Sequence, residues 1–428
     1  MKVSRSAIDG FWKRFMKDSL YRNSLYLIGS TAVVAVFGFF FWILAARFYD
    51  TKDVGLVAAL VAVSNVVMTL SLLGFDNSFI RYLPKSHYRN NQLNTGFTIT
   101  AVLSLVVGAV YLIAIRLFVP ELQFVTSTLL WSVFFLFFML VNLLNYLSNF
   151  PFVALRITHI ILMINTGFGL LRVIALVAFS NYGLTGLLLS HVLATTVAFL
   201  VTGYCLAKKA DYRPKLLVDF AELRRIMRYT LNSYFSAVFL TLPTYLLPTL
   251  VVGQLGAKSS AYYYIVAVII AALNVIPLAT SQSLFAEGVW DWGGLRSHLV
   301  KSVKVIAYLM LPATAVLIIG GKLILSLFGK EYATGGYGLL AVLVVAAIPK
   351  VFSYLLSTIL RIEHKVGIVA LIYGLYAGIV LVGSYVGIHA GRGLISVGWS
   401  TLAAELVTAL LFAGAYASMR RQQLAATH

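Results

Sequence analysis

The chain contains 428 residues, of which 61% are hydrophobic and only 11% are charged. Because soluble domains are about 45–50% apolar and about 25% charged, this composition excludes an ordinary soluble protein, and it also excludes a disordered one. The formal net charge is +19, but Lys and Arg fall mostly between apolar runs rather than on one soluble face, which argues against a nucleic-acid partner. We therefore expect an all-α, polytopic membrane protein.

Twelve apolar runs are long enough to cross a bilayer, which requires about 20 residues. In chain order the predicted spans are 24–46, 53–74, 94–118, 124–149, 156–180, 183–207, 229–252, 261–285, 303–325, 338–360, 367–388 and 395–418. The first run is longer than the apolar core of a signal peptide, which has about 7–15 residues, so we expect it to be retained in the protein.

The longest and most basic connection divides these spans into two sets of six. The predicted domains are an amphipathic basic N-terminus (1–23), a first six-helix bundle (24–207), a basic connection (208–228), a second six-helix bundle (229–418) and a tail (419–428). Both bundles then begin on the same side of the membrane, which is typical of parallel repeats in transporters.

Lys and Arg are distributed unevenly between the two sides of the membrane. The connections on the side of the two termini hold twenty-four of them, and the connections on the opposite side hold seven. By the positive-inside rule, this asymmetry predicts an even number of spans in the cytoplasmic (inner) membrane, with both termini in the cytoplasm.

Three prolines, Pro243, Pro248 and Pro277, fall inside the seventh and eighth predicted spans. A proline removes one backbone hydrogen bond from a helix and bends it. We predict that these residues act as hinges during a working cycle; the alternative is that they form static kinks that only shape the bundle.

Three charged residues lie at membrane depth. At 1.5 Å per residue, Lys350 lies ~18 Å from the start of the predicted span 338–360, and Glu405 lies ~15 Å from the start of the span 395–418. Arg172 lies nearer the outer face. Because such charges cost at least ~2.5–3.5 kcal/mol, they face a cavity or a partner. Either Lys350 and Glu405 form a structural ion pair, or Lys350 and Arg172 attract an anionic substrate while Glu405 exchanges Na⁺ or H⁺.

No motif of a soluble enzyme occurs in the chain. A Walker loop, a GxSxG elbow and an HExxH pair are all absent, and the single cysteine, Cys205, excludes a disulfide scaffold and a multi-cysteine metal site. We therefore predict no catalytic residue, no metal site and no cofactor. At the inner end of the second span, Asp76 is either a gate or an interfacial anchor, and Arg81 is a candidate cavity residue.

Two connections resemble those of polysaccharide-exporting membrane proteins. One is RFYDTKDVG at 47–55, between the first two spans, and the other is LGFDNSFIRYLP at 73–84, after the second span. With the twelve spans and the basic central connection, the chain resembles Wzx-like oligosaccharide flippases of the multidrug/oligosaccharidyl-lipid/polysaccharide exporter superfamily, which includes the MATE transporters.

This resemblance implies a MATE-like fold with a central cleft and alternating access. The implied substrate is a polyprenyl-diphosphate-linked oligosaccharide, with Arg81 as a cavity or inner-mouth cation and Arg47 as an outer-mouth cation. Polysaccharide assembly proteins are the implied partners. The first span lacks the arginine usual in lipid II flippases, and only twelve spans are found instead of fourteen, which disfavours a peptidoglycan precursor.

Two other functions remain open. One is a multidrug or cation antiporter of the same fold, which would use membrane acids for cationic drugs, although Asp and Glu are scarce here. The other is a membrane-embedded glycan polymerase or glycosyltransferase, which would need a catalytic loop that the sequence lacks.

Overall fold

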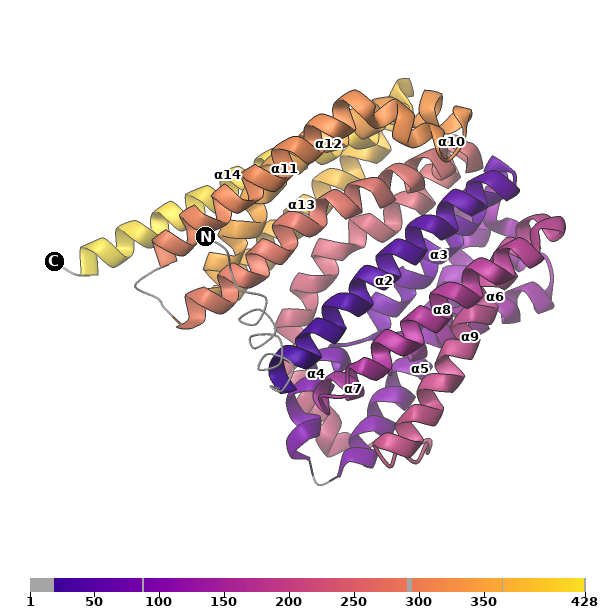
Figure 1. Cartoon of the computed structure of the whole chain (residues 1–428), viewed down its shortest axis with the longest axis horizontal. Helices are drawn as coiled ribbons and strands as arrows, with labels where there is room; N and C mark the ends of the chain where they lie inside the picture. The colour runs from indigo at the N-terminus through magenta and orange to yellow at the C-terminus, as the bar shows by residue number, and fades with distance from the viewer. Residues whose placement is uncertain (1–18, 87, 291–294, 364, 427–428) are drawn as a thin grey trace, which may run out of the picture. The chain divides into compact units, whose positions relative to one another are not determined.

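A computed structural model describes residues 19–86, 88–290, 295–363 and 365–426, and throughout them the regular elements are helices (Figure 1). The α-helices are α2 (Ser19–Phe48), α3 (Thr51–Ser71), α4 (Phe75–Tyr82), α5 (Arg89–Phe118), α6 (Leu129–Leu147), α7 (Phe150–Ala154), α8 (His159–Ala178), α9 (Gly183–Lys209), α10 (Phe220–Trp290), α11 (Leu295–Ser326), α12 (Lys330–Ile362), α13 (Val366–Gly387) and α14 (Ile395–Ala426). Short 3-10 helices, η1 (Leu83–Lys85), η2 (Pro120–Thr126) and η3 (Ser180–Tyr182), and a π-helical turn, η4 (Ile388–Arg392), join some of them.

Eleven of the described helical segments are long and apolar enough to cross a membrane. One of them, Val238–Phe285, has 48 residues, whereas about 20 residues are enough for one crossing. Gly256 interrupts this segment with φ 81° and ψ 172°, a conformation that essentially only glycine adopts. The two halves correspond to the seventh and eighth predicted spans, and the expected all-α membrane fold is confirmed.

The helical content is divided between two compact units. The first contains the chain up to Phe48 together with Val67–Ala114 and Phe124–Leu231, and the second contains Tyr49–Val66, Ile115–Gln123 and the chain from Asn232 onward. The division into six-helix bundles at 208–228 stays a prediction.

In the first unit, α8 packs between α2 and α9, and α6 packs on α9 (Figure 1). Polar contacts reinforce the α2–α8 pair: the Thr158 hydroxyl donates to Asn23 Oδ1 at 2.8 Å, and Asn165 Nδ2 donates to Ser30 Oγ at 2.7 Å. In the second unit, α14 packs on both α12 and α13, and α11 packs on α12. The core of this unit is built from residues such as Ile359, Tyr373 and Phe412.

The basic connection is shorter than predicted, because α9 extends to Lys209 and α10 already begins at Phe220. The intervening strip is held against the start of α5 by side-chain amides. Asn90 donates to the Asp211 carbonyl at 3.1 Å and accepts from the Arg213 amide at 2.7 Å. Asn94 repeats this pattern one turn later with Arg213 and Lys215. These bonds satisfy backbone groups that no secondary structure satisfies.

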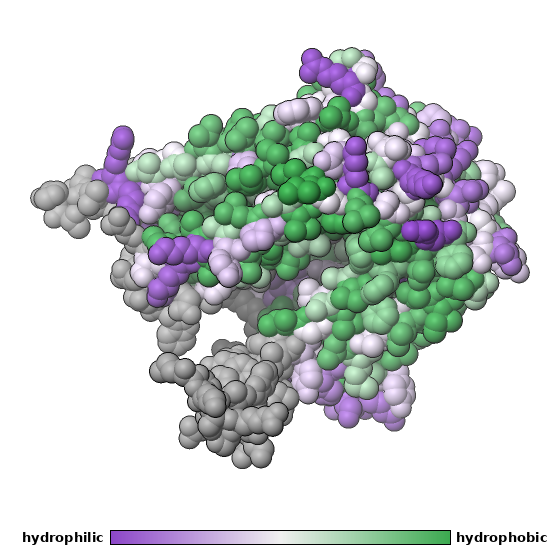
Figure 2. Space-filling view, turned by 45° about the horizontal axis from the view of Figure 1, so that its top comes forward, coloured by the Kyte–Doolittle hydropathy of each residue, from purple (hydrophilic) through white to green (hydrophobic). Residues whose placement is uncertain are grey.

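The surface is the one expected of a protein dissolved in lipid. Figure 2 shows hydrophobic side chains across much of the visible face, with hydrophilic residues mostly toward its edges. Large apolar side chains such as Tyr308 (81% exposed) and Ile319 (86% exposed) stand outward from α11. Most of the predicted segment 1–23 lies outside the described residues, and the predicted tail continues α14 as helix as far as Ala426.

Candidate functional site

Arg172 is buried in the first unit, with 8% of its surface exposed. Its guanidinium carbon lies 4.3 Å from the centre of the Phe41 ring of α2 and 5.0 Å from that of Phe168, one turn earlier on α8. Both contacts are cation–π interactions, which strengthen when the pair is removed from water. Gly38 of α2 lies beside the group: a Cβ there would be in ordinary van der Waals contact, 3.7 Å from an Arg172 terminal nitrogen.

His191 completes an aromatic enclosure around the same place. Its ring meets Phe41, Phe138 and Phe168 edge to face, with centroids 5.9, 5.5 and 6.3 Å apart. These residues come from α2, α6, α8 and α9, so four helices of the first unit converge here. The chain places Phe168 four residues before Arg172, which is the one contact that helical spacing could have indicated.

Lys350 and Glu405 meet in the second unit. Lys350 Nζ of α12 lies 3.0 Å from Glu405 Oε1 of α14, and their side chains are 21% and 4% exposed. The ion pair considered from the sequence is therefore present. It neutralises the two membrane-depth charges of this unit against each other, whereas Arg172 belongs to the other unit. That Lys350 and Arg172 attract an anionic substrate while Glu405 exchanges an ion stays a prediction.

Tyrosines surround this pair. The Lys350 ammonium lies 5.7 Å from the Tyr376 ring centre and 5.9 Å from that of Tyr354, and Tyr376 hydrogen-bonds Glu405. The pair, these tyrosines and Ser353 border a cavity of ≈ 10 Å³, about the space needed by one water molecule. The hydroxyl of Ser353 has no hydrogen-bond partner among the described residues. The arrangement can hold a proton or one small polar species.

The other predicted charges lie near helix ends. Arg47 is exposed in the last turn of α2. Asp76 lies in the first turn of α4 and accepts a hydrogen bond from Asn77 Nδ2 at 3.3 Å; burial raises the pKa of the Asp76 carboxyl above its ordinary value. Arg81 lies in α4, but its side chain is outside the described set.

A pocket beside the second resembling motif, LGFDNSFIRYLP at 73–84, contains two arginines whose place in the sequence indicated only the orientation of the chain in the membrane. Arg89 and Arg156 line a space of ≈ 470 Å³ together with Ile80 and Pro84. Arg156 holds φ at +59°, an uncommon conformation for a residue other than glycine. Arg89 donates to the Pro84 carbonyl at 3.3 Å. Linear spacing gives no sign of this shared pocket, because α5, α6 and α7 lie between the two arginines.

The first resembling motif ends in Gly55, at a contact within the second unit. A Cβ at Gly55 would lie 1.8 Å from the Ala257 carbonyl oxygen, directly after the break at Gly256. Nearby, Glu331 Oε2 lies 3.6 Å from Lys258 Nζ and accepts from the Tyr262 hydroxyl at 3.3 Å. The motif glycine thus permits close backbone packing against the interrupted helix.

The three predicted hinge prolines all lie inside α10. Pro243 and Pro248 precede Gly256, and Pro277 follows it. The Pro248 carbonyl accepts a hydrogen bond from the Ser260 hydroxyl at 3.3 Å, across the break. Whether these residues bend during a cycle stays a prediction.

Solved structures similar to this chain are membrane transporters. An inward-facing multidrug resistance MATE family transporter of the MOP superfamily is 14% identical, with 94% of this chain and 99% of that chain covered and a TM-score of 0.71. The lipid II flippase MurJ in an inward closed conformation is 13% identical, with coverage of 92% and 87% and a TM-score of 0.67. A MOP superfamily transporter from Pyrococcus furiosus is 14% identical, with coverage of 94% and 95% and a TM-score of 0.57. At these identities the likeness shows the fold, which is MATE-like.

Comparison with curated protein sequences gave no match. A family model described as polysaccharide biosynthesis protein, however, matches residues 43–335. This range contains both resembling motifs, and it includes Arg172 and the break at Gly256. Since the match extends over more than half of its length, the chain belongs to the polysaccharide biosynthesis protein family.

Proposed function

We propose that this protein moves a polyprenyl-diphosphate-linked oligosaccharide from the inner to the outer leaflet of the cytoplasmic membrane by alternating access, for the assembly of a surface polysaccharide. The family, the MATE-like fold and the resemblance of the two motifs to those of oligosaccharide flippases support this proposal. The observation that carries it is the buried Arg172, since a cation at membrane depth suits a substrate that brings two phosphates into the bilayer.

The acidic residues of the spans favour an anionic substrate over a cationic one. The eleven segments contain three of them, and Asp53 and Glu331 lie in the first turns of their helices. The third, Glu405, is already paired with Lys350. A cation antiporter would need a membrane carboxylate that is available to its substrate, so this pairing disfavours that alternative.

In our proposal, the substrate's diphosphate first meets the inner arginine pocket formed by Arg89 and Arg156, and Arg81 acts as a further cation at the inner mouth. Arginine binds phosphate through two parallel hydrogen bonds, which fixes the orientation of the group. Arg172 then attracts the diphosphate into the membrane, and Arg47 attracts it at the outer end. The lipid tail stays in the bilayer throughout, while the glycan crosses in a wet cleft.

Lys350 and Glu405 are proposed to couple this movement to an ion. Opening of the pair would expose a carboxylate to Na⁺ or H⁺, and the bordering cavity offers space for such an exchange. Gate action by Asp76 at the inner mouth belongs to the same proposal. Glycosyltransferases and other polysaccharide assembly proteins are the expected partners, because they supply and consume a lipid-linked glycan.

The bending of α10 is proposed to accompany the cycle, since three prolines weaken its backbone bonding on both sides of Gly256. Replacing Pro243, Pro248 and Pro277 together by alanine should then slow transport several-fold while the protein remains folded. Unchanged transport by the folded triple variant would reject the hinge and leave static kinks as the explanation.

The test of transport uses purified protein in vesicles that carry a labelled polyprenyl-diphosphate oligosaccharide in one leaflet. Arrival of the glycan at the other leaflet is measured with a membrane-impermeant hydrolase. We expect Arg172→Ala to abolish most of this movement, whereas Arg116→Ala, an exposed arginine at the end of α5, should leave it intact. The proposal fails if the wild-type protein moves no lipid-linked glycan, or if Arg172→Ala moves it as fast as wild type. Polymerisation of the glycan without movement would favour the enzyme alternative.

A further inference from the structure

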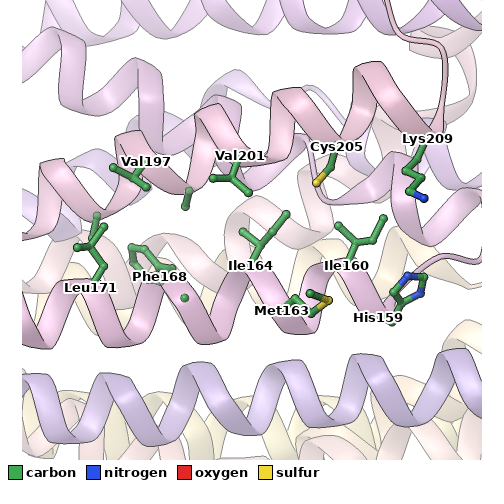
Figure 3. Close-up of a pocket in the computed structure, with 13 residues that line it drawn as sticks. His159, Ile160, Met163, Ile164, Phe168, Leu171, Val197, Val201, Cys205 and Lys209 are labelled. Carbon is green, nitrogen blue, oxygen red and sulfur yellow. The ribbon is translucent and has the colours of Figure 1, made fainter.

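An apolar groove runs along the first unit between α8 and α9. It has a volume of ≈ 460 Å³, and α8 contributes Met163 and Leu171 while α9 contributes Val197 and Val201 to its walls (Figure 3). Gly167 widens it, because a Cβ at this position would meet no atom within 4 Å. Ile160, Ile164 and Ala198, which are themselves buried, form part of its lining and belong to the packed core of this unit. The groove is therefore a surface furrow with a tight floor.

The two polar side chains at the groove lie at the same end. Figure 3 shows His159, at the start of α8, near Lys209, at the end of α9, with the apolar side chains extending away from them. Both residues are exposed. The ammonium of Lys209 and a ring nitrogen of His159 can both donate hydrogen bonds to phosphate oxygens. The groove thus has one cationic end and one apolar end.

The length of the groove matches one leaflet of a bilayer. Twelve residues separate His159 from Leu171 and Val197 from Lys209, which corresponds to ~18 Å of helix. One leaflet accounts for about half of a hydrocarbon core that is ~30 Å thick. If the phosphate of a phospholipid lies at the helix ends, one of its acyl chains would fill the groove. A polyprenyl chain is much longer, so most of the polyprenyl chain would lie outside the groove.

From this combination we infer a binding site for an anionic phospholipid between α8 and α9, with one acyl chain in the groove and the headgroup phosphate between His159 and Lys209. Basic residues where transmembrane helices reach the membrane surface commonly bind anionic lipid headgroups. The site lies within one unit, and Phe168 is the residue that its lining shares with the Arg172 enclosure. It does not depend on the proposed transport substrate.

The native chain already contains a reporter for this site. Cys205 is its single cysteine, it has a free thiol, and it lines the groove. In phosphatidylcholine vesicles, we expect added phosphatidylglycerol to slow alkylation of Cys205 by a membrane-permeant maleimide. Photolysis of phosphatidylglycerol with a diazirine on its acyl chain should label peptides of α8 and α9, and the phosphatidylcholine analogue should label them less.

Matched variants separate the groove from general lipid contact. Gly167→Leu on α8 fills the groove and should remove most of the labelling, whereas Gly203→Leu, at an α9 position with open space but outside the groove, should preserve it. Lys209→Gln should reduce the preference for the anionic lipid about fivefold, since one basic residue near the surface contributes ~1 kcal/mol. Lys208→Gln, its neighbour outside the groove, should have a smaller effect.

Three results would overturn the inference. One is equal labelling by the anionic and zwitterionic probes, and a second is equal loss in the Lys208 and Lys209 variants, which would indicate unspecific surface attraction. The third is protection of Cys205 by a polyprenyl phosphate but not by phosphatidylglycerol, which would assign the groove to another lipid. The transport assay is independent of all three, so failure here leaves the proposed function intact.

Discussion

Neutralising Glu405 alone should destabilise the protein far more than neutralising Lys350 and Glu405 together. Glu405→Gln retains the shape of the side chain but leaves the Lys350 ammonium at membrane depth without its counter-charge, 3.0 Å away. Breaking a buried pair in this way costs about 3–5 kcal/mol. Because the Lys350 side chain is 21% exposed, we expect the lower end, about 3 kcal/mol. This corresponds to roughly a hundredfold change in the folding equilibrium.

The assay is a reversible unfolding titration in mixed detergent micelles. It is performed on the single variants Glu405→Gln and Lys350→Met and on the double variant that combines them. The double variant removes both charges, and we expect it to recover most of the loss, since an apolar replacement of a buried pair is often neutral.

The chain provides a matched control in a second Lys–Glu pair. Lys258 and Glu331 lie 3.6 Å apart with side chains 65% and 57% exposed, and exposed pairs contribute about 0–1 kcal/mol. Glu331→Gln should therefore change the free energy of unfolding by less than about 1 kcal/mol. If Glu405→Gln destabilises the protein no more than Glu331→Gln does, the reasoning about the buried pair is wrong. A stable double variant that no longer transports would support the coupling role of the pair.

Three further substitutions test other features. Gly55→Ala should prevent accumulation of folded protein, measured by size-exclusion chromatography, because the new Cβ would lie 1.8 Å from the Ala257 carbonyl oxygen. Gly203→Ala, where the space is open, is the control, and a normal yield of both variants would contradict the close contact at Gly55. Arg172→Lys should retain the fold but lower glycan transport about tenfold, since a lysine cannot stack a planar group on two rings; wild-type rates would show that charge alone suffices. Burial raises the pKa of Asp76, so the folded state binds the carboxyl proton more tightly than the unfolded state does. The free energy of unfolding should therefore fall as the pH rises from about 3.8, the ordinary pKa, through the raised pKa of the folded state. Asp76→Asn should lose this pH dependence, and identical pH profiles of the variant and the wild type would refute the prediction.

Hydropathy predicted the helices well because the bilayer imposes one length on every span. Each predicted run has a helical counterpart, and even the seventh and eighth spans were separated correctly, since the polar turn around Gly256 interrupts the apolar pattern. The start of α10 was predicted too late. The residues from 220 to 228 belong to α10, but they include Glu222, Arg224, Arg225 and Arg228, so a search for apolar runs does not detect them.

The candidate site could be predicted only in part. Arg172, Lys350 and Glu405 were detectable because a charge in an apolar run is conspicuous in one dimension. Their surroundings depend on which helices pack together, so the aromatic enclosure from four helices and the pocket that Arg89 and Arg156 share left no periodic signal. The Lys350–Glu405 ion pair was one of two alternatives predicted from the sequence. The sequence shows that the two residues lie at a similar depth in the membrane, but only the packing of α12 on α14 shows that they are in contact.

Gly256 has a consequence for the whole C-terminal part of the chain. Its φ of 81° and ψ of 172° divide what would be one continuous helix into a segment that crosses the membrane and a second segment that crosses back. If this residue took helical angles, the continuous helix would extend far beyond the bilayer, or one membrane crossing would be lost. In the second case, each later loop would lie on the opposite side of the membrane. The sidedness of every residue beyond it is therefore decided by the backbone torsion of a single amino acid that has no side chain.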